Sequence, residues 1–164
     1  TSFFGRGEVL KKELFEELAR AAFQMSQKKI GALLVMEKDV GLGDYLDMGI
    51  EVDAKVSAEM LLSIFNPSSP VHDGAAIIRK ARISRVGCFL PLARDQEISK
   101  SLGTRHRAAI GLAEETDAVV IVISEETGEI SLVADGEIDR NMDAVALLKR
   151  LKDIFWGANS PTAG

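Results

Sequence analysis

Arg105, His106 and Arg107 directly follow Thr104, at a point where the apolar pattern of a helix begins. A helix N-terminus carries partial positive charge and unpaired N–H groups, so cationic side chains are unfavourable there unless an anion is bound. Around an anion, the N–H groups, the helix dipole and the guanidinium groups converge on the same oxygens. The sequence therefore predicts a phosphate or pyrophosphate site, with Thr104 as N-cap. The alternative is a solvated basic turn that pairs with carboxylates such as Glu114.

A second group of polar residues, His72 and Asp73, precedes Gly74 and the apolar run 75–78. Asp-Gly is a common turn dipeptide, and an ordinary turn is the alternative interpretation. However, the segment 66–70 already contains the residues of a turn, so Asp73 is expected at the entry to a strand. A carboxylate there is suited to binding a divalent cation or accepting a proton from a hydroxyl, and Gly74 allows close approach of a ligand.

The elements that must position these residues alternate between helices and short apolar strands, without an internal repeat or low-complexity linker. This pattern predicts a single α/β domain with a central mixed β-sheet flanked by helices. We expect a core over about 4–156 and a tail over 157–164. The expected helices cover 10–25, 57–65 with Ser57 as N-cap, a segment from 104, and 142–156, and the expected strands cover 30–35, 50–52, 75–78, 83–90, 118–123 and 129–134.

Composition limits the possible functions. The chain has 164 residues, 46% of them hydrophobic, which is enough for a sizeable core. Its net charge of −5 and its single Trp and single Tyr argue against a nucleic-acid partner, so anion binding must be local. The one cysteine, Cys88, lies in an apolar run and is expected to be a buried strand residue. The glycines of 41–43 lack the rest of a phosphate-loop motif and predict a flexible turn.

Three motifs together resemble a known family. The Asp-Gly-Ala triplet at 73–75, the Arg-His-Arg triplet at 105–107 and Ser-Glu-Glu at 124–126 are similar in order and spacing to the diadenylate cyclase (DAC) domain. The resemblance runs from about Phe3 to about Phe155. His72, directly before the first triplet, resembles the membrane-associated branch of that family.

The resemblance implies a reaction in which two ATP molecules are joined into cyclic di-AMP and two pyrophosphates leave. Each subunit of a face-to-face homodimer is expected to hold one ATP. Asp73 is expected at the 3′-hydroxyl, either as a general base or by holding a metal ion that lowers the pKa of that hydroxyl. His72 and Asp73 are the candidate ligands of Mn²⁺ or Mg²⁺, and an ordinary turn role for His72 remains the alternative.

The resemblance also implies roles in nucleotide binding. Arg105 and Arg107 are expected to clamp phosphates, with Thr104 and His106 adding hydrogen bonds, so that Asp73 and this triplet form the catalytic set. Further nucleotide-binding positions are expected near the phosphates or metal and around the adenine and ribose; the former are Ser124 and Glu126, and the latter are Gly74, Ala75 and Leu90. Serine and glutamate are also ordinary turn formers, and a leucine is often plain core.

Partners and location are implied by the resemblance alone. Relatives are controlled by a membrane regulator and by phosphoglucosamine mutase, and the full-length protein is expected at the cytoplasmic side of the cell membrane, with the present stretch of chain soluble. A different class of function is a non-catalytic module that binds a nucleotide or cyclic dinucleotide. Asp73 argues against that alternative, because a sensor has no use for a carboxylate beside the reacting hydroxyl.

Overall fold

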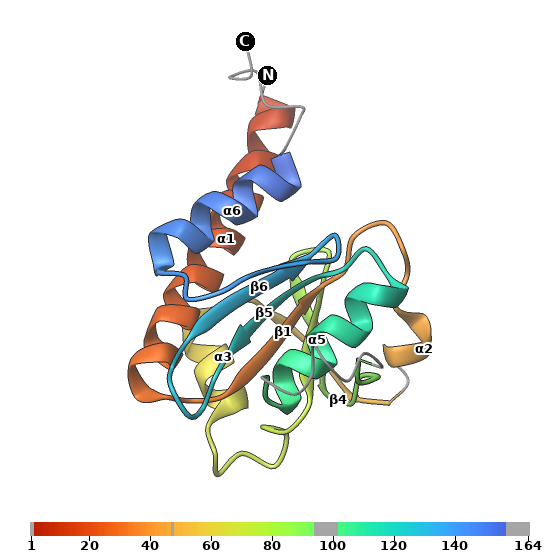
Figure 1. Ribbon diagram of the computed structural model, residues 1–164. Helices are drawn as coiled ribbons and strands as arrows, with labels where there is room; N and C mark the ends of the chain where they lie inside the picture. Colours follow the sequence, from red (N-terminus) through yellow and green to blue (C-terminus); the bar gives the residue numbers. More distant parts are fainter. Residues whose placement is uncertain (1, 47, 94–101, 157–164) are drawn as a thin grey trace.

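A mixed sheet of seven strands runs through the residues that this computed structural model describes, which are 2–46, 48–93 and 102–156. The strand order is β2-β4-β3-β1-β5-β6-β7. Helices cover both faces of the sheet (Figure 1). The strands are β1 (Ala32–Met36), β2 (Ile50–Lys55), β3 (Ala75–Arg79), β4 (Arg82–Cys88), β5 (Val119–Ile123), β6 (Ile130–Ala134) and β7 (Glu137–Asp139); the helices are α1 (Ser2–Lys28), α2 (Gly43–Leu46), α3 (Ala58–Phe65), α5 (Thr104–Glu115) and α6 (Ala144–Trp156).

The inner strands are apolar because both of their faces are covered. Every residue of β1, β5 and β6 is buried, as continuous apolar runs predict. The pair β1 and β3 is parallel, with Leu34 opposite Ala76, and β1 pairs with β5 in the antiparallel sense, with Ala32 opposite Ile123. The α/β class and the mixed sheet predicted from sequence are therefore confirmed.

One face of the sheet carries the larger core. Helices α1, α3 and α6 pack there, with α1 lying against both of the others (Figure 1). The apolar stripe of α1 includes Leu18, Ala22 and Met25, all fully buried. Ser57 is the N-cap of α3, as predicted, and its side chain accepts a hydrogen bond from the N–H of Met60.

The opposite face is covered mainly by α5, which packs on β5 and β6. Its core contacts come from Ala108, Ala109 and Leu112 against residues of β1 and β5. Small side chains allow α5 to approach the sheet closely, and this places its N-terminus beside the ends of the inner strands. The smaller core is therefore the one that positions the polar residues of interest.

Several boundaries differ from the prediction. The strand expected over 83–90 ends at Cys88, and Gly87 within it has a φ of +67°, a conformation that few residues other than glycine adopt. The last helix begins at Ala144 because Asp143 accepts a hydrogen bond from the N–H of Ala146. The strand β7 and the short α2, which begins at Gly43, were not predicted.

The expected tail, 157–164, lies outside the described residues. Within the residues that are described, the helices lack any stretch that is both long enough and apolar enough to cross a bilayer.

Cys88 is buried in β4, as predicted, and burial raises the pKa of its thiol, with Arg85 opposing that effect.

Candidate active site

The N-terminus of α5 is open to a ligand. The helix begins at Thr104, and its N-cap is Gly103, so the prediction that Thr104 is the N-cap is wrong by one residue. Since glycine has no side chain, no side-chain hydrogen bond from the described residues caps the first turn. That turn also lacks an acidic residue. Its N–H groups and partial positive charge therefore remain available to an external anion.

The turn between β5 and β6 faces this helix end. The hydroxyl oxygen of Ser124 accepts hydrogen bonds from the N–H groups of Glu126 and Thr127, at 3.2 and 3.3 Å. Gly128 has a φ of +79°, and its carbonyl accepts a hydrogen bond of 2.5 Å from the hydroxyl of Ser26 at the end of α1. Because the acceptor side of the Ser124 hydroxyl is used inside the turn, its hydrogen is free to be donated to a ligand.

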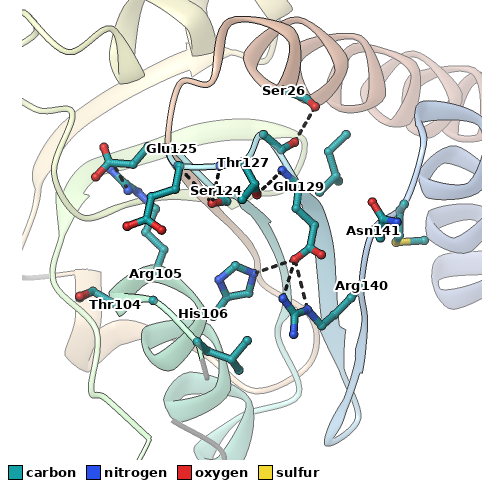
Figure 2. Close-up of a pocket in the computed structure, with 16 residues that line it drawn as sticks. Ser26, Thr104, Arg105, His106, Ser124, Glu125, Thr127, Glu129, Arg140 and Asn141 are labelled. Atoms are coloured by element: carbon teal, nitrogen blue, oxygen red, sulfur yellow. Dashed lines mark hydrogen bonds and ion pairs between the residues drawn. The ribbon is translucent and has the colours of Figure 1, made fainter. Parts of the chain in front are cut away.

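A cavity of about 670 Å³ lies between the helix end and the turn (Figure 2). This volume suits a small-molecule ligand. Five of the predicted site residues line it, together with residues from the loop that precedes α6; the five are Thr104, Arg105, His106, Ser124 and Glu126. The structure thus brings together residues from α5 and from the β5–β6 turn that are separated in sequence.

Arg105 points across the cavity toward the turn. Its Nη1 lies 3.6 Å from Oε2 of Glu125, so the ion pair of this arginine is with the turn rather than with Glu114 later in its own helix (Figure 2). The guanidinium also packs against Gly31, between α1 and β1. Arg105 therefore pairs with a carboxylate, as the alternative of a basic turn expected, but that carboxylate belongs to the β5–β6 turn.

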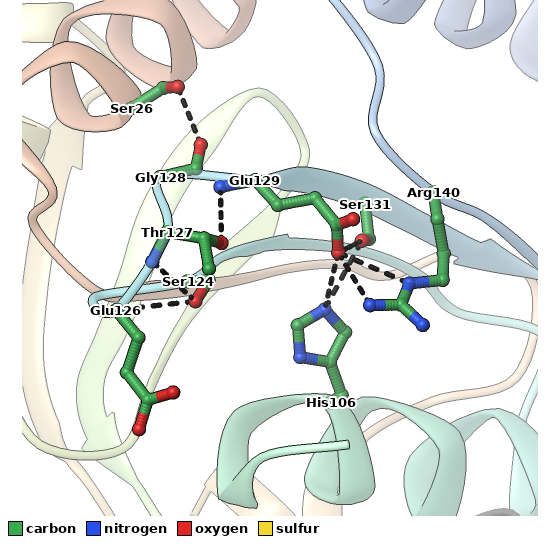
Figure 3. A network of polar contacts seen from close by, with 9 residues as sticks. All are labelled: Ser26, His106, Ser124, Glu126, Thr127, Gly128, Glu129, Ser131 and Arg140. Carbon is green, nitrogen blue, oxygen red and sulfur yellow. Dashed lines mark hydrogen bonds and ion pairs between the residues drawn. The ribbon is translucent and has the colours of Figure 1, made fainter. Parts of the chain in front are cut away.

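His106 is buried and belongs to a polar network that reaches the surface at the exposed Arg140 (Figure 3). The hydroxyl of Ser131 lies 3.4 Å from Oε2 of Glu129 and 3.2 Å from Nε2 of His106, and Arg140 donates two hydrogen bonds to that same carboxylate oxygen. If Ser131 donates to Glu129, its oxygen accepts from the Nε2–H of His106. Burial lowers the pKa of His106; the carboxylate of Glu129 opposes this shift and Arg140 adds to it. His106 is therefore a neutral donor inside the network at neutral pH.

His72 and Asp73 lie before β3 and do not line the cavity. Nδ1 of His72 is 2.7 Å from the carbonyl oxygen of Ser69, and because a carbonyl only accepts, Nδ1 carries the hydrogen. Nε2 of His72 lies 3.4 Å from Oδ1 of Asp73. An imidazole nitrogen and a carboxylate oxygen are thus side by side, and the Asp73 side chain is 71% exposed.

The sheet register connects the two groups. Extended by one residue, the pairing of β1 with β5 puts Gly31 opposite Ser124. Strand β3 runs parallel to β1 on its other side, and Asp73 lies two residues before β3 begins, at the same end of the sheet. The guanidinium of Arg105 lies over the central position, Gly31. The two groups therefore form one polar row.

The remaining predicted residues occupy different surroundings. Ala75 is buried in the smaller core, and Leu90 packs against that core while partly exposed. Gly74 has a φ of +88°, and a Cβ there would lie 2.9 Å from the carbonyl oxygen of Cys88. Arg107 does not line the cavity, and its Nε is buried without a hydrogen-bond partner among the described residues.

Sequence reasoning missed Glu129 and Arg140. Glu129 and Ser131 are two residues apart at the start of β6, so strand periodicity places them on one face. That pattern alone does not reveal His106 as their neighbour, because the contact depends on how α5 docks on the sheet. Arg140 carries no motif, and only the return of the chain from β7 brings it to the carboxylate.

A mixed α/β domain whose inner strands end beside an uncapped cationic helix N-terminus is a phosphate- or nucleotide-binding domain in its general form. The family model described as DAC, DisA bacterial checkpoint controller nucleotide-binding, matches residues 19–138. The chain belongs to the DAC family.

Individual relatives agree with this assignment. The chain is 43% identical over 157 residues to the cyclic di-AMP synthase CdaA of Bacillus subtilis, covering 93% of this chain and 58% of that protein. It is 42% identical over 151 residues to a diadenylate cyclase of Listeria monocytogenes, covering 92% and 55%. The chain therefore spans a little over half the length of these curated relatives, and the CdaA-type branch fits.

Solved structures support the same fold. A crystal structure of a double mutant of DacA from Staphylococcus aureus matches with a TM-score of 0.84 and 42% identity, covering 88% of this chain and 97% of that chain. A structure titled as a hypothetical membrane spanning protein from Bacillus cereus matches with a TM-score of 0.73 and 39% identity, covering 77% and 62%.

Proposed function

We propose that this chain is the catalytic domain of a diadenylate cyclase, which converts two ATP into cyclic di-AMP and two pyrophosphates. In each of two equivalent steps, a 3′-oxygen forms a bond to the α-phosphorus of the other nucleotide. The bond from that phosphorus to the bridging oxygen of the β-phosphate breaks, and pyrophosphate leaves with the electron pair. The hydroxyl proton is transferred to a base or to solvent.

The observation that carries this proposal is the cavity between α5 and the β5–β6 turn, in a chain that belongs to the DAC family. Free N–H groups of the helix, the Arg105 guanidinium and the Ser124 hydroxyl all face one space. Preorganised donors of this kind stabilise the negative charge that moves onto the leaving pyrophosphate. Positioning and charge neutralisation are the main contributions that this chemistry requires from a protein.

A divalent cation fits the geometry at Asp73. Nε2 of His72 lies beside the Asp73 carboxylate, and Nδ1 donates to a backbone carbonyl, which is the usual second contact of a ligating histidine. Among the described residues, no group of three or more His, Cys, Asp or Glu side chains is placed to hold a metal. His72 and Asp73 would hold Mn²⁺ or Mg²⁺, which would supply Lewis-acid activation of the 3′-hydroxyl.

Catalysis in this proposal requires a face-to-face homodimer with one ATP in each subunit. The supporting feature is the separation between Asp73, which is largely exposed, and the phosphate cavity, which Asp73 does not line. An exposed carboxylate is free to meet groups brought by a second copy of the chain. Turnover per subunit should therefore rise with protein concentration until the dimer is saturated.

We further propose, from membership in the family, that the full-length protein acts at the cytoplasmic side of the cell membrane. A membrane regulator and phosphoglucosamine mutase are the proposed regulatory partners. Support for membrane association comes from the similar structure titled as a hypothetical membrane spanning protein.

The test is incubation of the purified chain with ATP and either Mn²⁺ or Mg²⁺, with a parallel sample in excess chelator. Products are separated by chromatography and identified by mass. Cyclic di-AMP and two equivalents of pyrophosphate, formed only with metal, are the expected result. A chain that is dimeric and binds ATP but forms no cyclic di-AMP contradicts the proposal and supports a non-catalytic nucleotide-binding module.

A further inference from the structure

Gly31 leaves a space that the guanidinium of Arg105 occupies. A Cβ atom at position 31 would lie 2.3 Å from Cζ, 2.4 Å from Nη1 and 2.7 Å from Nη2 of that arginine. Carbon atoms in ordinary contact are ~3.5–4.0 Å apart, so a side chain at position 31 and the present position of Arg105 exclude each other. The guanidinium thus lies where every other amino acid would place its first side-chain carbon.

This contact lies at a critical place in the polar row. Gly31 lies in the segment between α1 and β1, and β1 is the strand between β3, which follows Asp73, and β5, which ends just before Ser124. The guanidinium also makes a 3.6 Å ion pair to the exposed Glu125, and this distance is too long for a strong hydrogen bond. The absence of a side chain at Gly31 is therefore the feature that allows Arg105 to reach its position.

We propose that Gly31 is a positioning residue for nucleotide binding, acting through Arg105; this proposal rests on the proposed function of the cavity. A larger residue at position 31 moves the guanidinium away from the row and weakens its contact with the phosphates. The fold should tolerate the change, because Arg105 is flexible and Gly31 is not among the glycines with positive φ. The effect is thus predicted on binding and turnover rather than on folding.

The first experiment is the substitution Gly31→Ala. A charge-assisted hydrogen bond contributes enough that its loss should weaken ATP binding by about tenfold or more and raise KM accordingly. The Tm should change by less than ~4 °C. The matched control is Gly41→Ala, since a Cβ at Gly41 has no atom within 4 Å among the described residues, and ATP affinity should be unchanged. Unchanged affinity in Gly31→Ala would overturn the proposal.

A double-mutant cycle with Arg105→Ala tests whether Gly31 acts through this arginine. In the Arg105→Ala background, adding Gly31→Ala should weaken ATP binding by less than about twofold, because the displaced group is already missing. Full additivity of the two effects would contradict the proposal. If Gly31→Ala lowers Tm by more than ~4 °C, Arg105→Ala should restore it, and a decrease that persists in the double variant would also contradict the proposal.

Failure of this inference and failure of the proposed function are distinguishable. Binding of inorganic pyrophosphate, measured by calorimetry for the parent and the three variants of the cycle, reports on Arg105 without any turnover. If the parent forms no cyclic di-AMP, the cyclase proposal fails, while a tenfold effect of Gly31→Ala on pyrophosphate affinity still supports the positioning role. If the effects of Gly31→Ala and Arg105→Ala on pyrophosphate affinity are additive, the positioning role is overturned, even if the parent is an active cyclase.

Discussion

The polar row of Asp73, Gly31 and Ser124 continues to Glu129, whose carbonyl accepts a hydrogen bond from the N–H of Ser124, and its two ends are built in opposite ways. Around Glu129, the carboxylate, Arg140, Ser131 and His106 are joined by contacts within the protein, and only 6% of His106 is exposed (Figure 3). Asp73, at the other end, has 71% of its side chain exposed, and its carboxylate lies 3.4 Å from the neighbouring His72. The end at Glu129 is fixed by contacts within the protein, whereas the carboxylate of Asp73 is accessible to a ligand or a cation.

This difference indicates that the two ends have different functions. A phosphate site benefits from donors that are already in place, since fixed dipoles need no reorganisation when charge develops. A carboxylate that binds a cation or accepts a proton must instead be accessible to those groups. Substitutions at the exposed end should therefore change chemistry without changing stability, and substitutions at the networked end should change stability first.

The largest expected effect is at the exposed end. Asp73→Asn removes the negative charge and should lower the formation of cyclic di-AMP by about a hundredfold or more, because both metal binding and proton transfer lose their acceptor. The free energy of unfolding should remain within about 0.5 kcal/mol of the parent, as for other exposed sites. Asp153→Asn, on the exposed side of α6, is the charge-matched control for turnover. A large loss of stability in Asp73→Asn would remove the contrast between the two ends.

At the networked end, the turn itself should be sensitive to Gly128→Ala. The φ of +79° disfavours alanine, and its Cβ would lie 2.5 Å from the backbone carbonyl oxygen of Ser26, which cannot move aside cheaply. We expect a loss of about 3 kcal/mol in unfolding free energy, measured by urea denaturation. Gly136→Ala is the matched control, because Gly136 has a φ of +75° with open space around it, and it should cost only about 1 kcal/mol. Equal losses would show that the contact with α1 contributes nothing.

Glu129→Ala should remove the acceptor of the polar network. Arg140 loses two solvent-exposed hydrogen bonds and Ser131 loses its acceptor, so the unfolding free energy should fall by about 1 kcal/mol. Glu126→Ala, in the neighbouring exposed turn, should change it by less than about 0.5 kcal/mol. Similar values for the two variants, measured by denaturation, would mean that the network does not stabilise the fold.

The smallest expected effect is a dependence of stability on pH. The pKa of His106 is lowered in the folded protein from its ordinary value of 6.5, so the unfolded chain binds the proton more readily. The contribution of neutral His106 to the free energy of unfolding is fully present above pH 6.5 and is lost as the pH falls toward the lowered pKa. Denaturation of the parent and of His106→Gln between pH 7.5 and pH 5 should give curves that converge at low pH. If the two curves of stability against pH stay parallel, a group other than His106 causes the pH dependence.

Sequence reasoning succeeded where the signal is local. The buried run at β5, the N-cap at Ser57 and the apolar stripe of α1 depend on neighbours within a few residues, and all are present in the structure. Likewise, the motifs at 73–75 and 105–107 indicated the family correctly.

What could not be predicted depends on docking between distant segments. The pairing of His106 with Glu129 requires α5 to lie at one particular angle on the sheet, and the contact of Arg105 with Gly31 joins a helix to a loop far earlier in the chain. Local patterns carry no information about such angles. The N-cap shift from Thr104 to Gly103 is a smaller case, since a hydroxyl residue is the usual cap, and glycine leaves the site open.

The hydrogen bond from Ser26 to Gly128 connects α1 to the β5–β6 turn, so this helix has a second structural role. The helix fills the larger core through Leu18 and Met25, and its last turn also supports the loop that faces the cavity. For protein engineering, the smallest unit that retains the proposed phosphate site should therefore include α1 through Ser26, although Ser26 is the only described residue of that helix in the cavity wall.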